Sequence, residues 1–345
     1  MMEHFKVRAP GVVKLLGEHA VVYGKLSVAV ALGMYSLAEA ADGPAGKIVI
    51  EVPDWGGARL EADARELGEA YDDYKSMELG AFGKKHGWPR PGSMLPFAVI
   101  AGRMAADHGA STAGVHIVMH SDIPPGKGCA SSAATSAAFT VALARWCKAS
   151  PSDGDMIDII RDGERLFHMN RNAGAIDAST TYYGGCVSYE AERQARREEI
   201  GSGIGMVLID TGPKAPTSET VGRVAEIYRT RRDYAQGLLD RIDVCSRRGL
   251  DALKAGDLAL LGAYMNEDHE LLRQLGVSSK RLDEAVYAAR RMGALGAKLS
   301  GGGGGGIAIA ISETAERLAS QLRASGFNTY TADISMTGAG ESNSK

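Results

Sequence analysis

The stretch that decides the fold is Asp122-Ile-Pro-Pro-Gly-Lys-Gly-Cys-Ala-Ser-Ser-Ala-Ala134. It follows an alternating run, residues 115–120, and leads into a segment of small helix formers, so it predicts a strand, a loop and a helix. Gly126 and Gly128 allow the loop backbone to approach a ligand closely. Unpaired N–H groups of the loop and of the first helical turn, together with the helix dipole, predict a phosphate site. Alone, the stretch is equally compatible with a tight turn and a serine N-cap.

Two further glycine-containing segments accompany this loop. The first is Ala9-Pro-Gly-Val-Val-Lys-Leu-Leu-Gly-Glu-His-Ala-Val-Val-Tyr-Gly24, and the second is Lys298-Leu-Ser-Gly-Gly-Gly-Gly-Gly-Gly-Ile-Ala-Ile-Ala310. In order and spacing, the three segments resemble the signature motifs of the GHMP superfamily, which comprises galactokinase, homoserine kinase, mevalonate kinase and phosphomevalonate kinase. The first motif, over residues 17–24, looks specifically like that of the mevalonate kinase family. The resemblance runs over nearly the whole chain.

The pattern of the whole chain predicts an α+β fold. The charged run 190–199 is typical of a solvated hairpin or a linker, and the residues from about 338 to 345 are expected to fray. The six consecutive glycines are compatible with a flexible linker, but their place between a helix and an alternating strand favours a turn. Strands are predicted at 27–32, 47–52, 115–120, 205–210, 307–311 and 328–334, and helices at 98–109, 131–149 and 314–325, with three or four more between about 220 and 297.

The family resemblance implies a two-domain arrangement with the active site between the domains. The N-terminal domain, residues 1–190, would be an α/β unit with a left-handed βαβ-type core that carries the first two motifs. The C-terminal domain, residues 191–345, would be a ferredoxin-like unit that brings the third motif to the phosphate region.

Composition limits the partners. The chain has 345 residues, of which 45% are apolar and 23% charged, enough for a substantial core in a globular protein. The formal net charge of −3 disfavours nucleic acid and anionic membranes as partners. No apolar run approaches the ~18 residues of a membrane span, and residues 1–8 have no signal-peptide core. The four cysteines lack CxxC spacing, which predicts reduced thiols and a cytoplasmic protein. The family is often dimeric, so a homodimer is compatible with the resemblance.

The phosphate loop differs from a Walker A loop, because no Gly-Lys pair in it is followed by Ser or Thr at the required spacing. The resemblance implies that the second and third motifs hold ATP. The side chain of Lys127 is compatible either with a phosphate contact or with a position in solvent. The predicted nucleotide-binding residues are Pro125, Gly126, Lys127, Gly128, Cys129, Ala130, Ser131, Ser132, Gly302, Gly303 and Gly304.

A magnesium ion that accompanies ATP needs only a few protein oxygens beside phosphate and water. The segment Gly163-Glu164-Arg165-Leu-Phe-His168 resembles the family segment whose glutamate binds Mg²⁺ together with a serine of the second motif. Glu164 is therefore the predicted carboxylate ligand, and the hydroxyl ligand is Ser131 or Ser132. An amphipathic helix without a metal is the alternative interpretation.

The catalytic base is predicted from a third segment. Gly174-Ala175-Ile176-Asp177-Ala178, followed by Tyr183-Gly184-Gly185, matches the family's catalytic-aspartate region. Asp177 is thus the predicted base that takes the acceptor's proton. The proline and serine often found before this aspartate are missing here, and a local turn cap is the alternative role.

The first motif departs from the family pattern at one position. The residue after Pro-Gly is usually a lysine, whereas this chain has Val12 and places a lysine two residues later, at Lys14. Residues two apart in a strand share a face and lie about 6–7 Å apart. We therefore predict that Lys14 replaces the missing lysine and that its ammonium reaches Asp177 or a bound phosphate. A surface lysine without a role is the alternative.

The resemblance also indicates where the acceptor binds. Glu18 and His19 follow the first-motif strand, and Thr217 resembles a threonine that closes over the acceptor. Three other histidines, His116, His120 and His168, are expected to be structural.

The implied function is ATP-dependent phosphorylation of the primary hydroxyl of mevalonate, a step of isoprenoid precursor synthesis. Two alternatives remain from the sequence. One is a GHMP kinase that acts on a phosphorylated mevalonate or another small hydroxy acid. The other is a nucleotide-binding regulator that has lost catalysis, which the valine at position 12 would suggest.

Overall fold

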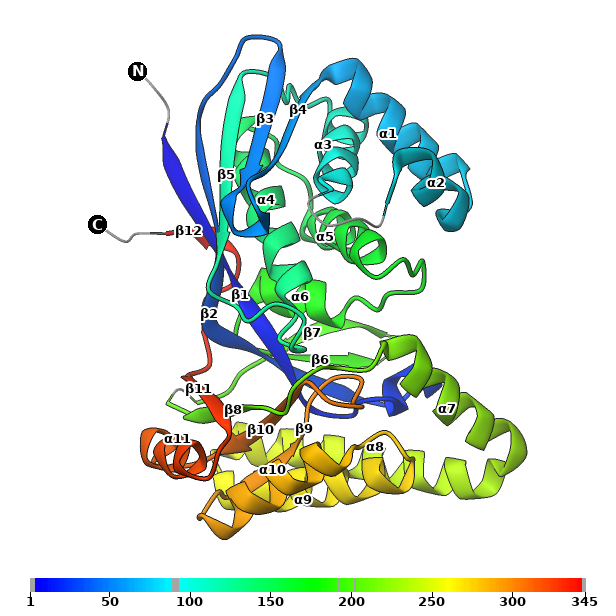
Figure 1. Cartoon of the computed structure of the whole chain (residues 1–345), viewed down its shortest axis with the longest axis vertical. Coiled ribbons are helices and arrows are strands. Elements are labelled where there is room, and N and C mark those ends of the chain that lie inside the picture. The colour runs from blue at the N-terminus through cyan, green and yellow to red at the C-terminus, as the bar shows by residue number, and fades with distance from the viewer. Residues whose placement is uncertain (1–3, 89–92, 191–192, 202, 343–345) are drawn as a thin grey trace.

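The computed structural model describes residues 4–88, 93–190, 193–201 and 203–342 (Figure 1). Its strands are β1 (Phe5–Leu16), β2 (Ser27–Asp42), β3 (Lys47–Val52), β4 (Ala58–Asp63), β5 (Val115–Ser121), β6 (Cys186–Glu190), β7 (Arg193–Glu198), β8 (Met206–Asp210), β9 (Gly296–Leu299), β10 (Ile307–Ile311), β11 (Asn328–Ala332) and β12 (Gly340–Glu341). Its α-helices are α1 (Ala64–Ser76), α2 (Leu79–His86), α3 (Leu95–His108), α4 (Ser131–Trp146), α5 (Asp153–Phe167), α6 (Ile176–Tyr183), α7 (Thr217–Thr230), α8 (Arg232–Ala255), α9 (Leu258–Gln274), α10 (Lys280–Arg291) and α11 (Ala315–Ala324).

The first sheet has eight strands and forms one half of the molecule. Its main path runs β12-β1-β2-β5-β3-β4, and β6 pairs with both β2 and β7. The pair β3–β5 is parallel, and the chain between these strands passes through β4 and the helices α1 to α3. Helix α4 packs on this sheet, and α3 and α5 pack against α4 (Figure 1); Phe97 of α3 and Phe139 of α4 are fully buried in the same core as Ile117 of β5. Burial of these apolar faces drives the assembly of this half.

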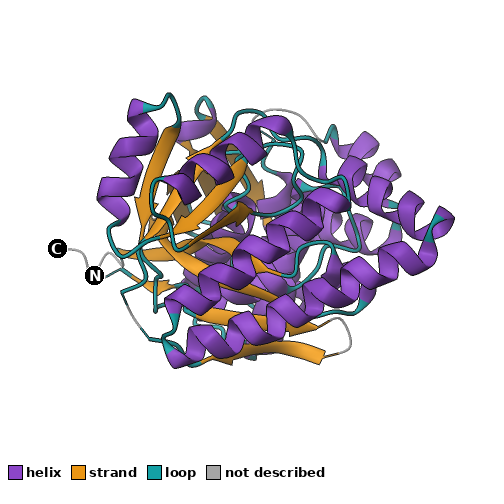
Figure 2. Ribbon diagram, turned by 90° about the horizontal axis from the view of Figure 1, so that it is seen from below, coloured by secondary structure: helices purple, strands orange, loops and turns teal. Residues whose placement is uncertain are grey.

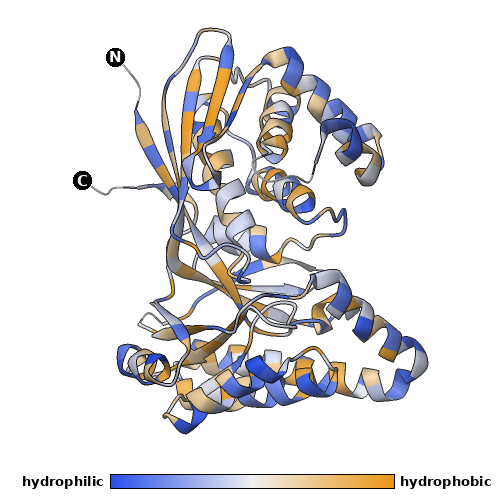
Figure 3. Ribbon diagram, viewed as in Figure 1, coloured by the Kyte–Doolittle hydropathy of each residue, from blue (hydrophilic) through white to orange (hydrophobic). Residues whose placement is uncertain are grey.

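The second half is a ferredoxin-like unit. Its elements follow the order β8, helices α7 to α10, β9, β10, α11 and β11, and the sheet order is β11-β8-β10-β9. Numbered within this sheet, the strands lie in the order fourth, first, third, second, and all three pairings are antiparallel. The helices of this half cross one face of the strands (Figure 2) and turn their polar sides outward (Figure 3). The predicted ferredoxin-like topology is confirmed.

Strands β1 and β2 connect the two halves (Figure 1). The ends of these strands contribute Leu15, Leu16 and Val28 to a hydrophobic core that also contains Leu208 of β8 and Ile242 of α8. The end of β1, which carries the first motif, is therefore fixed at the junction of the two sheets. None of the helices within the described ranges is long and apolar enough to cross a membrane.

Most predicted elements are confirmed, and the charged run is a hairpin in which Cys186 of β6 lies opposite Glu198 of β7. Strand β7 belongs to the first sheet, so the chain passes to the second sheet only after residue 198. The predicted boundary between the two domains, at residue 190, stays a prediction.

The prediction of a frayed tail is wrong as far as residue 342. Strand β12 pairs with β1, and the Ala339 N–H donates to the Thr181 carbonyl of α6 at 2.9 Å. Gly338 allows this contact, because a Cβ there would lie 1.9 Å from the Tyr182 carbonyl oxygen. Residues 343–345 lie outside the described ranges.

Candidate active site

The predicted phosphate loop connects β5 to α4, which begins at Ser131. Gly126 and Gly128 have φ values of 70° and 97°, and Ala130, at the N-cap of α4, has φ 50°. An alanine in the left-handed region costs about 1 kcal/mol or more, and such strain is concentrated at functional loops. Because alanine has no side-chain oxygen to cap the helix, the first N–H groups of α4 remain available to an anion.

Two contacts anchor this loop. The Val12 N–H donates to the Cys129 carbonyl at 3.0 Å, which joins the loop to β1. The Lys127 ammonium pairs with Asp210 at the end of β8, at 2.9 Å, so this side chain joins the loop to the second sheet. Its predicted phosphate contact stays a prediction. Burial raises the pKa of the Cys129 thiol to about 12, which keeps it neutral.

The glycine run is a tightly packed turn, so the linker alternative is wrong. Gly301 and the four glycines 303–306 all have positive φ. A Cβ on Gly303 would lie 2.1 Å from the Val277 carbonyl oxygen, and a Cβ on Gly305 would lie 2.0 Å from that of Pro213. A Cβ on Gly306 would lie 2.9 Å from the Lys127 carbonyl oxygen, so the turn abuts the phosphate loop. Only glycine satisfies both the close approach and the backbone conformation.

Lys14 and Asp177 form an ion pair. The Lys14 ammonium lies 2.7 Å and 2.8 Å from the two carboxylate oxygens of Asp177, and about one-fifth of each side chain is exposed. Burial alone would lower the pKa of Lys14, but the charge and hydrogen bond of Asp177 outweigh it and raise the pKa. Lys14 therefore carries its positive charge at neutral pH, and the predicted contact is confirmed.

Position 12 faces the same helix terminus as position 14. The Val12 side chain is buried in a small apolar cluster with Ala29 and Ile176, the residue before Asp177. Asp177 lies in the first turn of α6, where the helix dipole favours a negative charge. Side chains from positions 12 and 14 thus both reach the start of α6, as the two-residue period of a strand requires.

The predicted metal ligands meet at the start of α4. Among the described side chains, Ser132 is the serine whose hydroxyl contacts the buried Glu164 carboxylate, on α5. His168 Nε2 lies 3.2 Å from Ser132 Oγ and 3.7 Å from the Glu164 carboxylate, whose interaction with the imidazole raises the pKa of His168. A hydroxyl and a carboxylate beside a phosphate loop are hard oxygen donors that fit Mg²⁺. His168, expected to be structural, belongs to this cluster.

The predicted acceptor residues lie where the first motif meets the glycine turn. His19 Nε2 is 3.0 Å from the Gly302 carbonyl oxygen, and since a carbonyl only accepts, Nε2 carries the proton and Nδ1 is an acceptor. Burial lowers the pKa of His19 to about 4, so the imidazole is neutral at pH 7. Thr217 is the first residue of α7. It lies beside Gly302, since a Cβ on Gly302 would be 3.2 Å from the Thr217 hydroxyl oxygen.

Glu18 is held by a lysine that the sequence analysis did not select. The fully buried Lys298 ammonium, on β9, contacts Glu18 Oε1, and Asp268 of α9 lies 3.5 Å away. Burial raises the pKa of Asp268 above its ordinary range. The other Glu18 oxygen is buried and has no hydrogen-bond partner among the described residues, so it is a candidate acceptor for a substrate hydroxyl.

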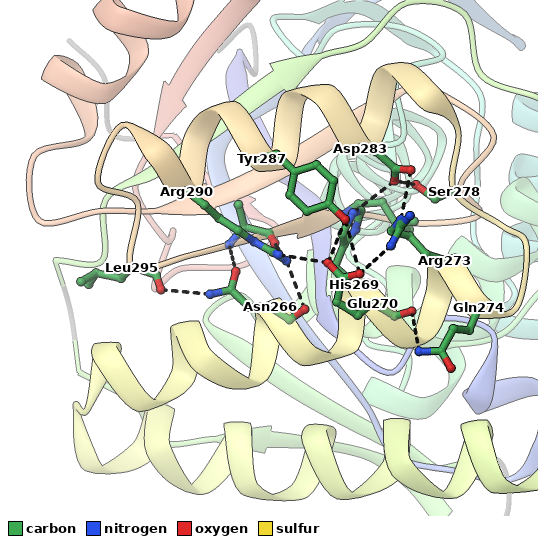
Figure 4. A network of polar contacts seen from close by, with 12 residues as sticks. Asn266, His269, Glu270, Arg273, Gln274, Ser278, Asp283, Tyr287, Arg290 and Leu295 are labelled. Atoms are coloured by element: carbon green, nitrogen blue, oxygen red, sulfur yellow. Dashed lines mark hydrogen bonds and ion pairs between the residues drawn. The ribbon is translucent and has the colours of Figure 1, made fainter.

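A polar network between α9 and α10 fixes β9, and with it Lys298 (Figure 4). Asn266 accepts from the Ala297 N–H at 3.0 Å, and Arg290 donates to the Ala297 carbonyl at 3.0 Å. Arg290 also pairs with Glu270, which binds the Tyr287 hydroxyl on the neighbouring turn of α10. Both backbone groups of residue 297 are therefore bound by side chains that are themselves paired, which defines the strand position.

Ser300 is a second residue that the sequence analysis missed. Its hydroxyl accepts from the Lys14 N–H and donates to the Lys14 carbonyl, each at 3.1 Å, and so joins β1 to the glycine turn. A signal was present for both missed residues: a lysine and a serine at the end of an apolar strand, directly before the glycine run. Polar side chains in that position require buried partners.

The chain matches both the N-terminal and the C-terminal family models of the GHMP kinases. Residues 96–185 match the GHMP kinase N-terminal domain, and residues 250–328 match the GHMP kinase C-terminal region. A mevalonate kinase of Pyrococcus furiosus is 30% identical over 338 residues, which cover 96% of each chain. A mevalonate kinase of Aeropyrum pernix is 28% identical over 346 residues, which cover 97% of each chain.

Solved structures show the same fold. The crystal structure of the Methanococcus jannaschii mevalonate kinase superposes with a TM-score of 0.80 at 23% identity, covering 96% of this chain and 98% of that one. A galactokinase of Lactococcus lactis superposes with a TM-score of 0.76 at 16% identity, covering 99% and 95%. At these identities the structures support the fold, whereas the sequence matches extend over the three motifs and the residues described above. The chain therefore belongs to the GHMP kinases and, within them, to the family of the archaeal mevalonate kinases.

Proposed function

We propose that this protein transfers the γ-phosphoryl group of ATP to the primary hydroxyl of mevalonate. The observation that carries the proposal is the Lys14–Asp177 ion pair, whose strand is hydrogen-bonded to the phosphate loop through Val12 and to Ser300, directly before the glycine turn. Full-length relatives named mevalonate kinase support the choice of acceptor.

The chemistry requires one proton transfer and one phosphoryl transfer. Asp177 accepts the proton of the acceptor hydroxyl as the hydroxyl oxygen bonds to the γ-phosphorus and the bond to the β–γ bridging oxygen breaks. ADP leaves with the bridging oxygen. Lys14 orients the Asp177 carboxylate and, as a fixed cation, lowers the cost of the negative charge that shifts among the phosphate oxygens.

The phosphate loop would hold the ATP phosphates through its backbone N–H groups. Ser132 and Glu164 would hold Mg²⁺, which supplies positive charge to the phosphate oxygens when it is bound. Glu18 and His19 would orient the acceptor, with the free Glu18 oxygen and His19 Nδ1 as hydrogen-bond acceptors.

The two alternative functions, a kinase for a phosphorylated acceptor and a catalytically silent regulator, require different groups in the site. A phosphorylated acceptor needs additional cationic groups at its own phosphate, and the Lys298 ammonium near Glu18 is already paired and fully buried. A catalytically silent regulator would have no reason to keep a lysine against Asp177. The contact of Lys14 with that carboxylate, and of Ser132 with Glu164, favours an active kinase.

ADP release by the purified full-length chain tests the proposal. With MgATP and a panel of mevalonate, 5-phosphomevalonate, homoserine and galactose, we expect turnover with mevalonate well above the rate without acceptor. Turnover confined to 5-phosphomevalonate would establish the first rival. ATP binding without ADP release for any acceptor would establish the second.

We also propose a cytoplasmic location and a homodimer. The four cysteines are all free, which suits a reducing cytoplasm. A homodimer is compatible with the family resemblance, and light scattering on the purified chain would test it.

A further inference from the structure

Lys214 is a cation in the active site to which neither the motifs nor the ion pairs assign a role. It lies in the loop between β8 and α7, and its side chain is partly buried. Among the described residues, none forms a hydrogen bond or ion pair with its ammonium, in contrast to Lys14, Lys127 and Lys298. A partly buried lysine without a partner is expected to have an anionic ligand.

The Lys214 side chain runs along the glycine turn. A Cβ on Gly306 would lie 3.4 Å from its Cβ and 3.5 Å from its Cδ, and a Cβ on Gly301 would lie 3.9 Å from its ammonium. Since Gly306 also abuts the Lys127 carbonyl, the side chain begins where the two phosphate-binding loops meet.

Charged groups of the candidate site act on the Lys214 ammonium. Burial and the neighbouring Lys14 charge lower the pKa of Lys214, while Asp177 and Glu164 act in the opposite direction. The positive charge of Lys214 in turn acts to lower the pKa of His19 and of His168. These charges act on a side chain that lies along the glycine turn, where the turn abuts the phosphate loop, so the ammonium lies beside both loops that are predicted to hold the nucleotide phosphates.

We propose that Lys214 binds the terminal phosphoryl group of ATP and stabilises it during transfer, as a second cation beside Lys14. This inference rests on the proposed phosphoryl transfer and assigns a further residue to it. Its physical basis is general: charge on the equatorial phosphoryl oxygens is stabilised by cations that are fixed before the reaction. Because ADP lacks the terminal phosphate, Lys214 should distinguish the two nucleotides.

Calorimetry of nucleotide binding tests the inference on the full chain. In Lys214→Met, we expect the Kd for the β,γ-imido analogue of ATP with Mg²⁺ to rise about 10- to 100-fold, and the Kd for MgADP to change less than about 2-fold. Lys214→Arg keeps the charge and should retain much of the analogue's affinity. Lys84→Met, which removes an exposed lysine of α2, is the matched control and should change neither Kd.

Steady-state kinetics adds a second reading. In Lys214→Met, kcat with mevalonate should fall about 10²- to 10³-fold, whereas the KM for mevalonate should change little. Equal changes in the two nucleotide Kd values, no change in either, or a rise confined to the KM for mevalonate would each overturn the inference. If Lys214→Met lost its native circular dichroism, Lys214→Arg with Lys214→Gln would decide by the same comparison.

The two proposals fail in different ways. A wild-type chain that releases no ADP with mevalonate, but whose Lys214→Met variant loses affinity only for the ATP analogue, would overturn the assigned acceptor and leave Lys214 as a terminal-phosphate ligand. A wild-type chain that phosphorylates mevalonate, but whose variant binds both nucleotides normally and turns over at the wild-type rate, would overturn the role of Lys214 alone.

Discussion

Lys14 and Asp177 are 163 residues apart in sequence, yet the lysine ammonium contacts both oxygens of the carboxylate, at 2.7 Å and 2.8 Å. The pair joins the first-motif strand to the start of α6. It explains how this chain can keep a cation at the predicted catalytic aspartate although the position after Pro-Gly is Val12. The lysine has moved along the strand by two residues, which is the smallest step that keeps it on the same face.

The first prediction is that Lys14→Met lowers kcat by about 10²- to 10³-fold, because a fixed cation at the transferred phosphoryl group is lost. The Kd for MgADP should change little. Steady-state kinetics and calorimetry measure the two effects. Lys6→Met is the matched control, because Lys6 lies on the same strand in a partly exposed pair with Glu39. The double variant Val12→Lys/Lys14→Leu should recover part of the lost kcat, and wild-type turnover in Lys14→Met would contradict the assignment.

The second prediction separates the two serines of the second motif. Ser132→Ala and Glu164→Gln should raise the Mg²⁺ concentration that gives half-maximal turnover, because each removes an oxygen from the shared cluster. Ser131→Ala should leave the Mg²⁺ dependence close to that of the wild type. Titration of nucleotide binding with Mn²⁺, followed by electron paramagnetic resonance, gives a readout independent of turnover. A larger effect in Ser131→Ala than in Ser132→Ala would contradict the assignment of Ser132 as the metal ligand.

The third prediction concerns the buried Lys298–Glu18 pair. Lys298→Met should lower the free energy of unfolding by about 3–5 kcal/mol, because it leaves the Glu18 carboxylate buried without its cation. The double variant Lys298→Met/Glu18→Gln should recover part of this loss. Denaturant unfolding of the wild type, both single variants and the double variant gives the coupling free energy. A loss below about 1 kcal/mol in Lys298→Met would mean that the pair contributes little to stability.

The fourth prediction is a pH dependence of stability that His19 causes. Its pKa is about 4 in the folded protein and near 6.5 when unfolded, so the unfolded state binds more protons between these values. Stability therefore falls as the pH decreases from about 6.5 to 4, by up to about 3 kcal/mol from this group. In His19→Gln, the amide can still donate to the Gly302 carbonyl, and this part of the stability loss at acidic pH should disappear. If the unfolding free energies of the wild type and of His19→Gln changed in parallel with pH, the assignment of a buried neutral imidazole to His19 would be contradicted.

The sequence was sufficient for the fold and for the placement of most candidate-site residues, because the motifs lie on local elements. A glycine-rich loop between a strand and a helix is recognisable from its own residues, and so is a glycine turn between a helix and a strand. The Lys14 contact was predictable as well, since it needs only the two-residue period of β1 and the family position of Asp177.

What the sequence could not supply are contacts between distant segments. The choice of Ser132 over Ser131 depends on the rotation of α4 against α5, which local patterns do not determine. Lys298 meets Glu18, and Lys214 comes to lie near the phosphate loop, only when the two sheets are packed together. The tail is expected to fray because it lies at the end of the chain, but Gly338 lets the chain pack closely on Tyr182 and pair with β1.

The most direct test of the account is the proton-coupled ³¹P NMR spectrum of the product that the full-length chain forms from MgATP and mevalonate. Transfer to the primary hydroxyl places the phosphorus next to a CH₂ group, so the account predicts a triplet for the new phosphate ester. The Asp177→Asn variant should form this product about 10²- to 10⁴-fold more slowly, because its amide cannot accept the hydroxyl proton. A singlet, which phosphorylation of the tertiary hydroxyl would give, or a wild-type rate in Asp177→Asn, would contradict the account.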